Sequence, residues 1–335
     1  MGKRYIAEDG SPVERRMHLF RIPWRRGRVR TAASLGDSLF RWLSGGVAVA
    51  VVGLLALIVA VLFVVADESI RTFGTGFLNG TIWNPVPPEV FGAVPFVYGT
   101  LVTSALALLF GVPISLGIAI FLSELAPRWL RVPLTYVVEL LAAVPSVVYG
   151  LWGIFVLSPV MRAFVEPVIQ DVFGFLPIFQ GNPIGTDKFT AGVILAVMII
   201  PTISSVSRES LLAVPQSQRE AALSLGATHW ETTRVAVLRY ARAGLFGAVI
   251  LGLGRAVGET MAVTMTIGNR NAISVSLFDQ GQTIASWIAN NFTEAGPLEL
   301  SALIELGLVL MLMSLAINIF ARLMVRRVMG VGEAA

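Results

Sequence analysis

The sequence lacks the residues from which thiol chemistry and most transition-metal sites are built. Its 335 residues include no cysteine and two histidines, His18 and His229, each alone in a polar stretch. Without cysteine, disulfides and thiolate metal sites are excluded. Two isolated histidines also argue against a histidine-based metal site or a catalytic triad. We therefore predict no catalytic residue and no metal site in this chain.

Charge is also scarce. Only 14% of residues are charged and 55% are apolar, whereas ordinary soluble domains carry roughly 25% charged residues. Water cannot solvate this composition as one globule, so the sequence predicts a polytopic membrane protein. Lysine occurs twice, at Lys3 and Lys188, and neither lies in a phosphate-binding Gly-rich loop. The chain is therefore expected to bind no cofactor and to be unable to hydrolyse ATP alone.

What the sequence has instead is long apolar runs. Stretch 132–161 carries only one charged residue, Glu139, and stretch 243–269 carries only Arg255 and Glu259. Four further stretches carry none, namely 42–66, 90–123, 189–207 and 306–321. A helix needs about 20 apolar residues to cross the hydrocarbon. The pattern predicts an all-α fold with six transmembrane helices, near 43–66, 94–122, 132–158, 189–207, 243–268 and 300–322.

The positive charges gather on one side of these helices. Both terminal segments and the loops after the second and fourth helices hold 20 of the 25 Lys and Arg residues, and the other three loops hold four. By the positive-inside rule, both termini are cytoplasmic, in a multi-pass protein of the bacterial cytoplasmic (inner) membrane.

Three regions are expected: a basic cytoplasmic segment at 1–42, a transmembrane domain at 43–325 and a cytoplasmic tail at 326–335. The first segment could bind nucleic acid, but we interpret it as a topology anchor beside an anionic leaflet, with no nucleic-acid partner. The leader before the first apolar run is too long for a signal peptide, so the first helix is expected to be a permanent anchor. The basic segment contains Arg15, Arg16, Arg21, Arg25, Arg26, Arg28 and Arg30.

A polar segment at 208–242 separates two very apolar stretches. Ser217 with Glu220, and Thr228 with Glu231, each have the spacing of a capping box, which predicts two helix starts. Gly226 between them suits the left-handed turn that ends a helix. The segment therefore predicts a helical hairpin that is presented to a partner, although an ordinary long loop is an alternative.

Four ionisable residues lie within the predicted spans. Arg255 and Glu259 are four apart, so on one helix they would share a face and could pair. This pair either locks the fifth helix to its neighbours or offers the guanidinium to a passing anion, with Glu259 holding Arg255 when no anion is bound. Glu139 could line a gate or simply be solvated near the interface. Glu305 is expected to be solvated at the outer end of the sixth helix.

The hairpin resembles the EAA loop of ABC importer permeases. The resemblance implies that its short helix, with Glu220, Ala221, Ala222 and Gly226, is the coupling helix that sits on a separate ATPase. In place of the final proline of the family pattern stands Arg239, which bears on how the second helix bends. The matching residues are Glu220, Ala221, Ala222, Gly226, Ala236 and Leu238.

Five further stretches resemble the first permease of phosphate-specific ABC importers, over roughly residues 45–325. The resemblance implies a type I ABC importer permease fold and transport of phosphate by alternating access. It implies as partners a second homologous permease, an ATP-binding subunit dimer carrying ATP and Mg, an extracytoplasmic phosphate-binding protein and membrane lipid. It associates Arg255 and Glu259 with transport, and we predict these two residues and Glu139 on the substrate pathway. The stretches are 94–109, 121–127, 138–153, 190–201 and 252–263.

Other interpretations stay open at this point. The same machine could carry another oxyanion, such as sulfate or molybdate. A gradient-driven secondary transporter would show inverted repeats, and none is evident. A membrane enzyme would need a cluster of His, Asp or Glu that the sequence lacks. The outer stretch 159–188 is a candidate docking surface for the extracytoplasmic partner.

Overall fold

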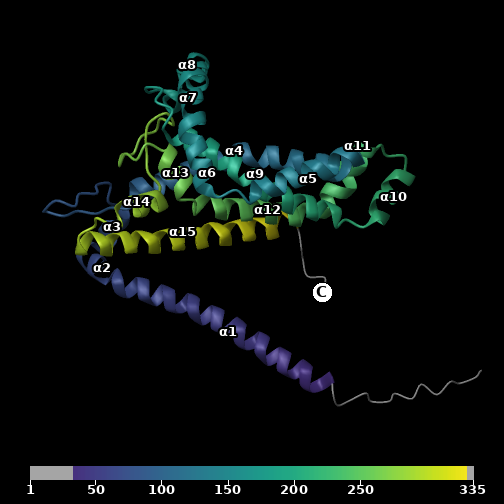
Figure 1. The fold of residues 1–335 in the computed structure, drawn as a ribbon, viewed down its shortest axis with the longest axis horizontal. Helices are drawn as coiled ribbons and strands as arrows, with labels where there is room; N and C mark the ends of the chain where they lie inside the picture. The colour runs from purple at the N-terminus through teal and green to yellow at the C-terminus, as the bar shows by residue number, and fades with distance from the viewer. Residues whose placement is uncertain (1–32, 330–335) are drawn as a thin grey trace, which may run out of the picture. The chain divides into compact units, whose positions relative to one another are not determined.

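The computed structural model describes residues 33–329, nearly all of them helical (Figure 1). The chain divides by its internal contacts into two units, residues 1–57 and 58–335. The described part of the first unit is the greater part of one helix, α1 (Ala33–Val65). The predicted basic arginine segment lies outside the described residues, except for its last ten positions, which open α1.

The second unit is an assembly of long helices with short ones at its ends. Its first elements are α2 (Asp67–Phe73), α3 (Thr75–Asn79), α4 (Val94–Ile120), η1 (Phe121–Leu125) and α5 (Arg128–Ala142). Next come α6 (Ser146–Trp152), η2 (Gly153–Leu157), α7 (Ser158–Val160), η3 (Met161–Val165), α8 (Glu166–Phe173), η4 (Pro177–Phe179) and α9 (Lys188–Leu212). The last are α10 (Gln216–Ser224), α11 (His229–Thr232), η5 (Thr233–Val237), α12 (Leu238–Val257), α13 (Met261–Thr266), α14 (Ile284–Asn291) and α15 (Pro297–Met329).

Six helical stretches of the described chain are long and apolar enough to cross a membrane, which confirms the predicted number. Four of them lie close to the predicted positions, and the third and fifth differ. They are Gly36–Val65, Val94–Leu125, Ser146–Phe173, Lys188–Leu212, His229–Val257 and Pro297–Val325.

The third predicted helix, 132–158, is broken in two. Helix α5 ends at Ala142, and Pro145 takes an extended conformation (φ −60°, ψ 142°) as the residue before α6. Proline has no amide hydrogen and disfavours a helical conformation at the residue before it. At Pro145 the backbone is extended and the helix breaks, whereas Pro113 and Pro201 lie inside continuous helices. From Ser146 the helix then runs on through α8, and residues 159–173, expected in an outer loop, are helical.

Helix α9 lies at the centre of the second unit, and 67% of the residues in its apolar stretch are buried. Pro201 is inside this helix and Pro113 is inside α4, and neither ends its helix. Small residues bring the helices together: a Cβ on Gly192 would lie 2.5 Å from the Cβ of Leu106 on α4. Close approach at glycine is the usual way membrane helices gain packing energy. The packed trio α4, α9 and α12 forms the scaffold of the site.

Glu305 is buried, contrary to the expected solvation. Its side chain is on α15, is 8% exposed and accepts a 2.6 Å hydrogen bond from the Ser69 hydroxyl. Beside it Glu299 accepts a 2.9 Å hydrogen bond from the indole nitrogen of Trp83. These bonds tie α15 to α2 and to the loop after α3, which is a structural role that spacing along α15 could not reveal.

Candidate functional site

The polar hairpin at 208–242 forms as a helix, a glycine turn and a second helix. The amide of Gly226 donates to the carbonyl of Leu223, and the amide of Ala227 donates to that of Ala222. Gly226 has φ +86°, the left-handed conformation in which glycine carries no Cβ penalty. This is the Schellman arrangement, which satisfies the last carbonyls of a helix. The predicted Gly turn is confirmed.

One of the two predicted capping boxes is wrong. Helix α10 begins at Gln216 after Pro215, and no side chain caps it, so Ser217 is already the second helical residue. Pro215, whose ring fixes φ, is the residue before the helix, so α10 begins two residues earlier than a cap at Ser217 would give. The other box is correct: the Thr228 side chain accepts from the amide of Glu231, and the Glu231 carboxylate accepts from the amide of Thr228.

The predicted coupling residues lie on an uncovered surface. Glu220, Ala221 and Gly226 are exposed and Ala222 is half-buried. No residue of α10 is buried against the described chain, and Leu225 at its end is 89% exposed. Helix α10 and α11 lie together at one end of the second unit, away from α13 and α14 (Figure 1). An isolated nine-residue helix is marginal in water, so something must hold α10 in place.

What holds α10 is an ion pair that sequence reasoning missed. Arg219, the residue before Glu220, pairs with Glu124 on η1 at 2.8 Å, and the two side chains are 16% and 13% exposed. The same guanidinium donates to the carbonyls of Val214 at 2.6 Å and Leu211 at 2.9 Å. One arginine thus joins α10 to the ends of two long helices. The sequence feature that could have indicated this pair is a single carboxylate, Glu124, at the end of an apolar run.

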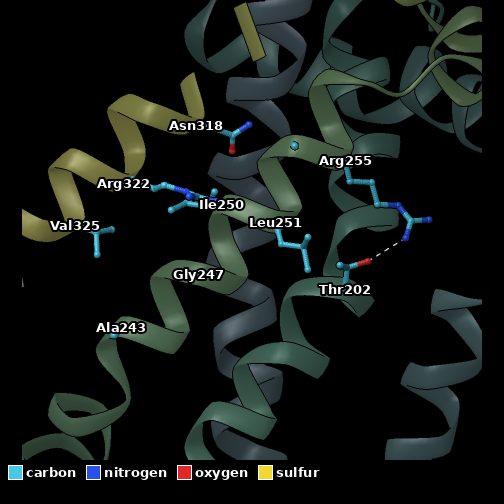
Figure 2. Close-up of a pocket in the computed structure, with 10 residues that line it drawn as sticks. Thr202, Ala243, Gly247, Ile250, Leu251, Arg255, Asn318, Arg322 and Val325 are labelled. Atoms are coloured by element: carbon cyan, nitrogen blue, oxygen red, sulfur yellow. Dashed lines mark hydrogen bonds between the residues drawn. The ribbon is translucent and has the colours of Figure 1, made fainter. Parts of the chain in front are cut away.

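A cavity of about 910 Å³ opens beside Arg255, between α12 and α15 with Thr202 of α9 at its edge (Figure 2). The Arg255 side chain leaves α12 and donates a 3.1 Å hydrogen bond to the hydroxyl of Thr202. The lining residues are Thr202, Ala243, Gly247, Ile250, Leu251, Gly254, Arg255, Asn318, Arg322 and Val325. None of these is an acid, so the cavity favours an anion.

Arg255 and Glu259 do not pair, contrary to the expectation from their spacing. Helix α12 ends at Val257, and α13 begins only at Met261. The break at Gly258 removes the shared helical face on which the prediction depended. The Glu259 carboxylate instead accepts a 3.2 Å hydrogen bond from the amide of Ala262 in the first turn of α13. Among the described residues Arg255 forms no ion pair, and the pairs Arg71–Asp67 and Arg219–Glu124 do not involve it.

Glu139 is not brought to this cavity. It is exposed on α5 and lines a separate hollow of about 10 Å³ with Ser204, Ser205 and Arg208. The structure therefore gathers Arg255 with Thr202, Asn318 and Arg322, and leaves Glu139 and Glu259 outside the lining. Asn318 and Arg322 are four apart and follow a long apolar stretch of α15, and that spacing was the signal that could have found them.

Comparison with known proteins gives the same picture. Residues 111–330 match the family described as binding-protein-dependent transport system inner membrane component. A Haemophilus influenzae protein named phosphate transport system permease protein PstC is 48% identical over 87% of this chain and 93% of its own length. The PstC 2 protein of Mycobacterium tuberculosis is 40% identical over 87% of this chain and 92% of its own.

Solved structures show the same fold. One chain of a bacterial alginate ABC transporter in complex with its periplasmic protein superposes with a TM-score of 0.59, at 15% identity, over 89% of this chain and 99% of that chain. One chain of the MetNI methionine ABC transporter in an inward-facing conformation gives a TM-score of 0.55, at 19% identity, over 70% of this chain and 95% of that chain. The similarity establishes the predicted permease fold.

Proposed function

This chain belongs to the family of binding-protein-dependent transport system inner membrane components, and we propose that it is the permease subunit of an ATP-driven importer of inorganic phosphate. The observation that carries the proposal is identity of 40% to 48% with proteins named phosphate transport permeases, over 87% of the chain. The free guanidinium of Arg255 in a cavity without acids agrees with an anionic cargo.

The proposed setting is the inner membrane, crossed six times, with both termini in the cytoplasm. The sequence supports this orientation, because 20 of its 25 cations lie in segments on one side. The orientation puts the hairpin at 208–242 in the cytoplasm. It also places the Arg255 end of α12 nearer the outer surface and the Arg322 end of α15 nearer the cytoplasm.

The energy would come from a partner, since no phosphate-binding loop for ATP is present in this sequence. We expect α10 to sit on the ATP-binding subunit, which holds ATP and Mg, and to transmit its movement to the spans. The short side chains of exposed Ala221 and half-buried Ala222 leave a low surface for close approach. The Arg219 tether to η1 gives this movement a stiff route into α4, because η1 continues that helix directly.

In the proposed transport step, Arg255 receives the anion when the cavity faces outward. The neutral hydroxyl of Thr202 orients the guanidinium without cancelling its charge, so several donors stay available to phosphate oxygens. Glu259 is held at the start of α13 and does not compete. A second permease and an extracytoplasmic binding protein would complete the pathway and supply selectivity.

The test is ATP-driven uptake of labelled phosphate by the assembled complex carrying Arg255→Gln. We expect uptake to be abolished while the ATPase and second permease still co-purify. Normal uptake with normal assembly would refute the role of Arg255. Labelled sulfate and molybdate in the same assay test the alternative cargo, because uptake of either in place of phosphate would overturn the assignment. Transport that survives removal of the ATPase would instead indicate a gradient-driven carrier.

A further inference from the structure

The cavity beside Arg255 is lined by a second cation, Arg322, which the sequence analysis did not single out. Arg322 lies on α15, one turn beyond Asn318, and both residues line the cavity. Figure 2 shows its side chain running from α15 toward Ile250 on α12, into the space between the two helices. Two arginines from different helices therefore line one hollow of about 910 Å³. The Arg255 side chain turns toward Thr202, and the Arg322 side chain approaches from α15 (Figure 2).

No acid balances these two cations. The lining holds neither Asp nor Glu, and no described carboxylate forms an ion pair with Arg322 or Arg255. An arginine within a membrane span is costly unless it faces water or a counter-charge. A cleft lined by one sign of charge concentrates ions of the opposite sign. No described carboxylate of this chain supplies the counter-charge, so the hollow can hold an anion beside these two cations.

The hollow continues along both helices. A neighbouring hollow of about 470 Å³ shares Gly254 and Asn318 with it and extends past Gly307 and Ser314 of α15. On α12 the first hollow runs from Arg255 to Ala243, which is about 18 Å at the helical rise of 1.5 Å per residue. Together the two hollows form a groove along the α12–α15 face, with Arg255 partway along it and Arg322 toward the other end of α15.

We propose that Arg322 is a second anion-binding residue, which receives the phosphate from Arg255 on its way to the cytoplasm. The inference rests on the proposed function. Two sites of moderate strength let an anion enter and leave, whereas one strong site would trap it. Asn318, one turn from Arg322, lines the same hollow, and its side-chain amide donates a 2.9 Å hydrogen bond to the carbonyl of Ser314 on its own helix.

A phosphate group could also come from a lipid. Arg322 lies three residues before the end of the last span, and a long cationic side chain there can extend to the headgroups of an anionic leaflet. Free phosphate is favoured, because Arg322 lines the same hollow as Arg255 and extends toward α12. The two sources share the same chemistry, so lipid composition must be varied in the test.

The experiment uses the full complex, with its ATPase and binding protein, reconstituted in vesicles of phosphatidylcholine alone or with phosphatidylglycerol added. Initial rates of labelled phosphate uptake are measured for the wild type, Arg322→Gln, Arg322→Lys and the control Arg327→Gln. Arg322 and Arg327 are both exposed on α15, and Arg327 does not line the cavity. Assembly is checked by co-purification of the second permease.

We expect Arg322→Gln to lower the uptake rate about tenfold in both lipids, the effect of losing one charged hydrogen-bond donor. Arg322→Lys should restore part of it, because an ammonium still binds phosphate as a point charge, and Arg327→Gln should match the wild type. A wild-type rate for Arg322→Gln would overturn the proposal. So would a defect confined to vesicles with phosphatidylglycerol, or loss of the second permease, which would indicate a lipid or helix contact.

The proposed function can fail separately. If the wild-type complex takes up sulfate and not phosphate, the phosphate assignment is wrong. The Arg322 inference is then tested by sulfate uptake in the same vesicles: a lowered rate for Arg322→Gln supports it, and a wild-type rate refutes it.

Discussion

Replacing Arg219 with alanine should uncouple the permease from its ATPase without unfolding the spans. The guanidinium contacts Glu124 at 2.8 Å and two backbone carbonyls at 2.6 Å and 2.9 Å. The alanine variant leaves the Glu124 carboxylate, 13% exposed, without its partner. Removing one member of a buried pair costs about 3–5 kcal/mol. We expect about 3 kcal/mol here, because both side chains keep some contact with water.

That energy is large for so small an element. Helix α10 has nine residues and none is buried, so this tether supplies a large share of what fixes its position beside its contacts with η5 and α11. A loss of about 3 kcal/mol lowers the population of correctly placed α10 on the order of a hundredfold, at about 1.4 kcal/mol per tenfold change. The long spans pack on α9 independently of this contact. Their folding should therefore change much less than the coupling does.

The assay is phosphate uptake and ATP hydrolysis by the reconstituted complex, together with thermal stability of the purified permease. Arg219→Ala should lower uptake per ATP hydrolysed by tenfold or more, while the spans still unfold cooperatively. Arg71→Ala is the matched control: its ion pair with Asp67 is also 2.8 Å, but the side chains are 79% and 50% exposed. Such an exposed pair contributes about 0.3–0.5 kcal/mol.

A double-mutant cycle with Glu124→Ala tests whether Arg219 acts through its ion pair with Glu124. If the pair acts as described, the double variant should be less impaired than the sum of the two single variants, because neither charge is then left unpaired. Strictly additive effects, or normal transport by Arg219→Ala, would refute the reasoning.

Three further perturbations test the glycine turn, the packing and the helix cap. Gly226→Ala places a side chain at φ +86°, so it should cost about 1–2 kcal/mol and weaken ATPase co-purification; unchanged binding would contradict this. Gly192→Ala brings a Cβ within 2.5 Å of Leu106, so thermal unfolding should show a loss of about 1–3 kcal/mol, and a neutral result would mean that α4 and α9 separate easily. Asp187→Ala removes the side chain that accepts from the amide of Thr190 at 2.8 Å at the start of α9. The free energy of unfolding should fall by about 1 kcal/mol, and Asp187→Asn should retain most of this stability. An equal loss in both variants would argue against a capping role.

Local features of the fold could be predicted from the sequence. Charge-free runs of span length indicate six membrane helices, because hydrocarbon tolerates little else. The Gly226 turn and the Thr228 cap were also predictable, because they depend on residues within one helical turn. The third span was misplaced for a related reason: both halves around Pro145 are apolar, and composition does not reveal where the backbone breaks. Ser217 shows that a short motif alone cannot fix a helix start.

The sequence by itself determined the membrane class, the number of spans and the exposed hairpin, all of which follow from hydropathy and from hydrogen bonds between near neighbours. Only the tertiary structure decided which charges meet. Arg219 and Glu124 are 95 residues apart, and Arg255 shares a cavity with Arg322 because α12 and α15 pack side by side. The break at Gly258 separated a pair that spacing alone had joined. Helix packing determines which side chains meet across helices. The sequence of one helix does not show which neighbouring helix its polar side chains will contact.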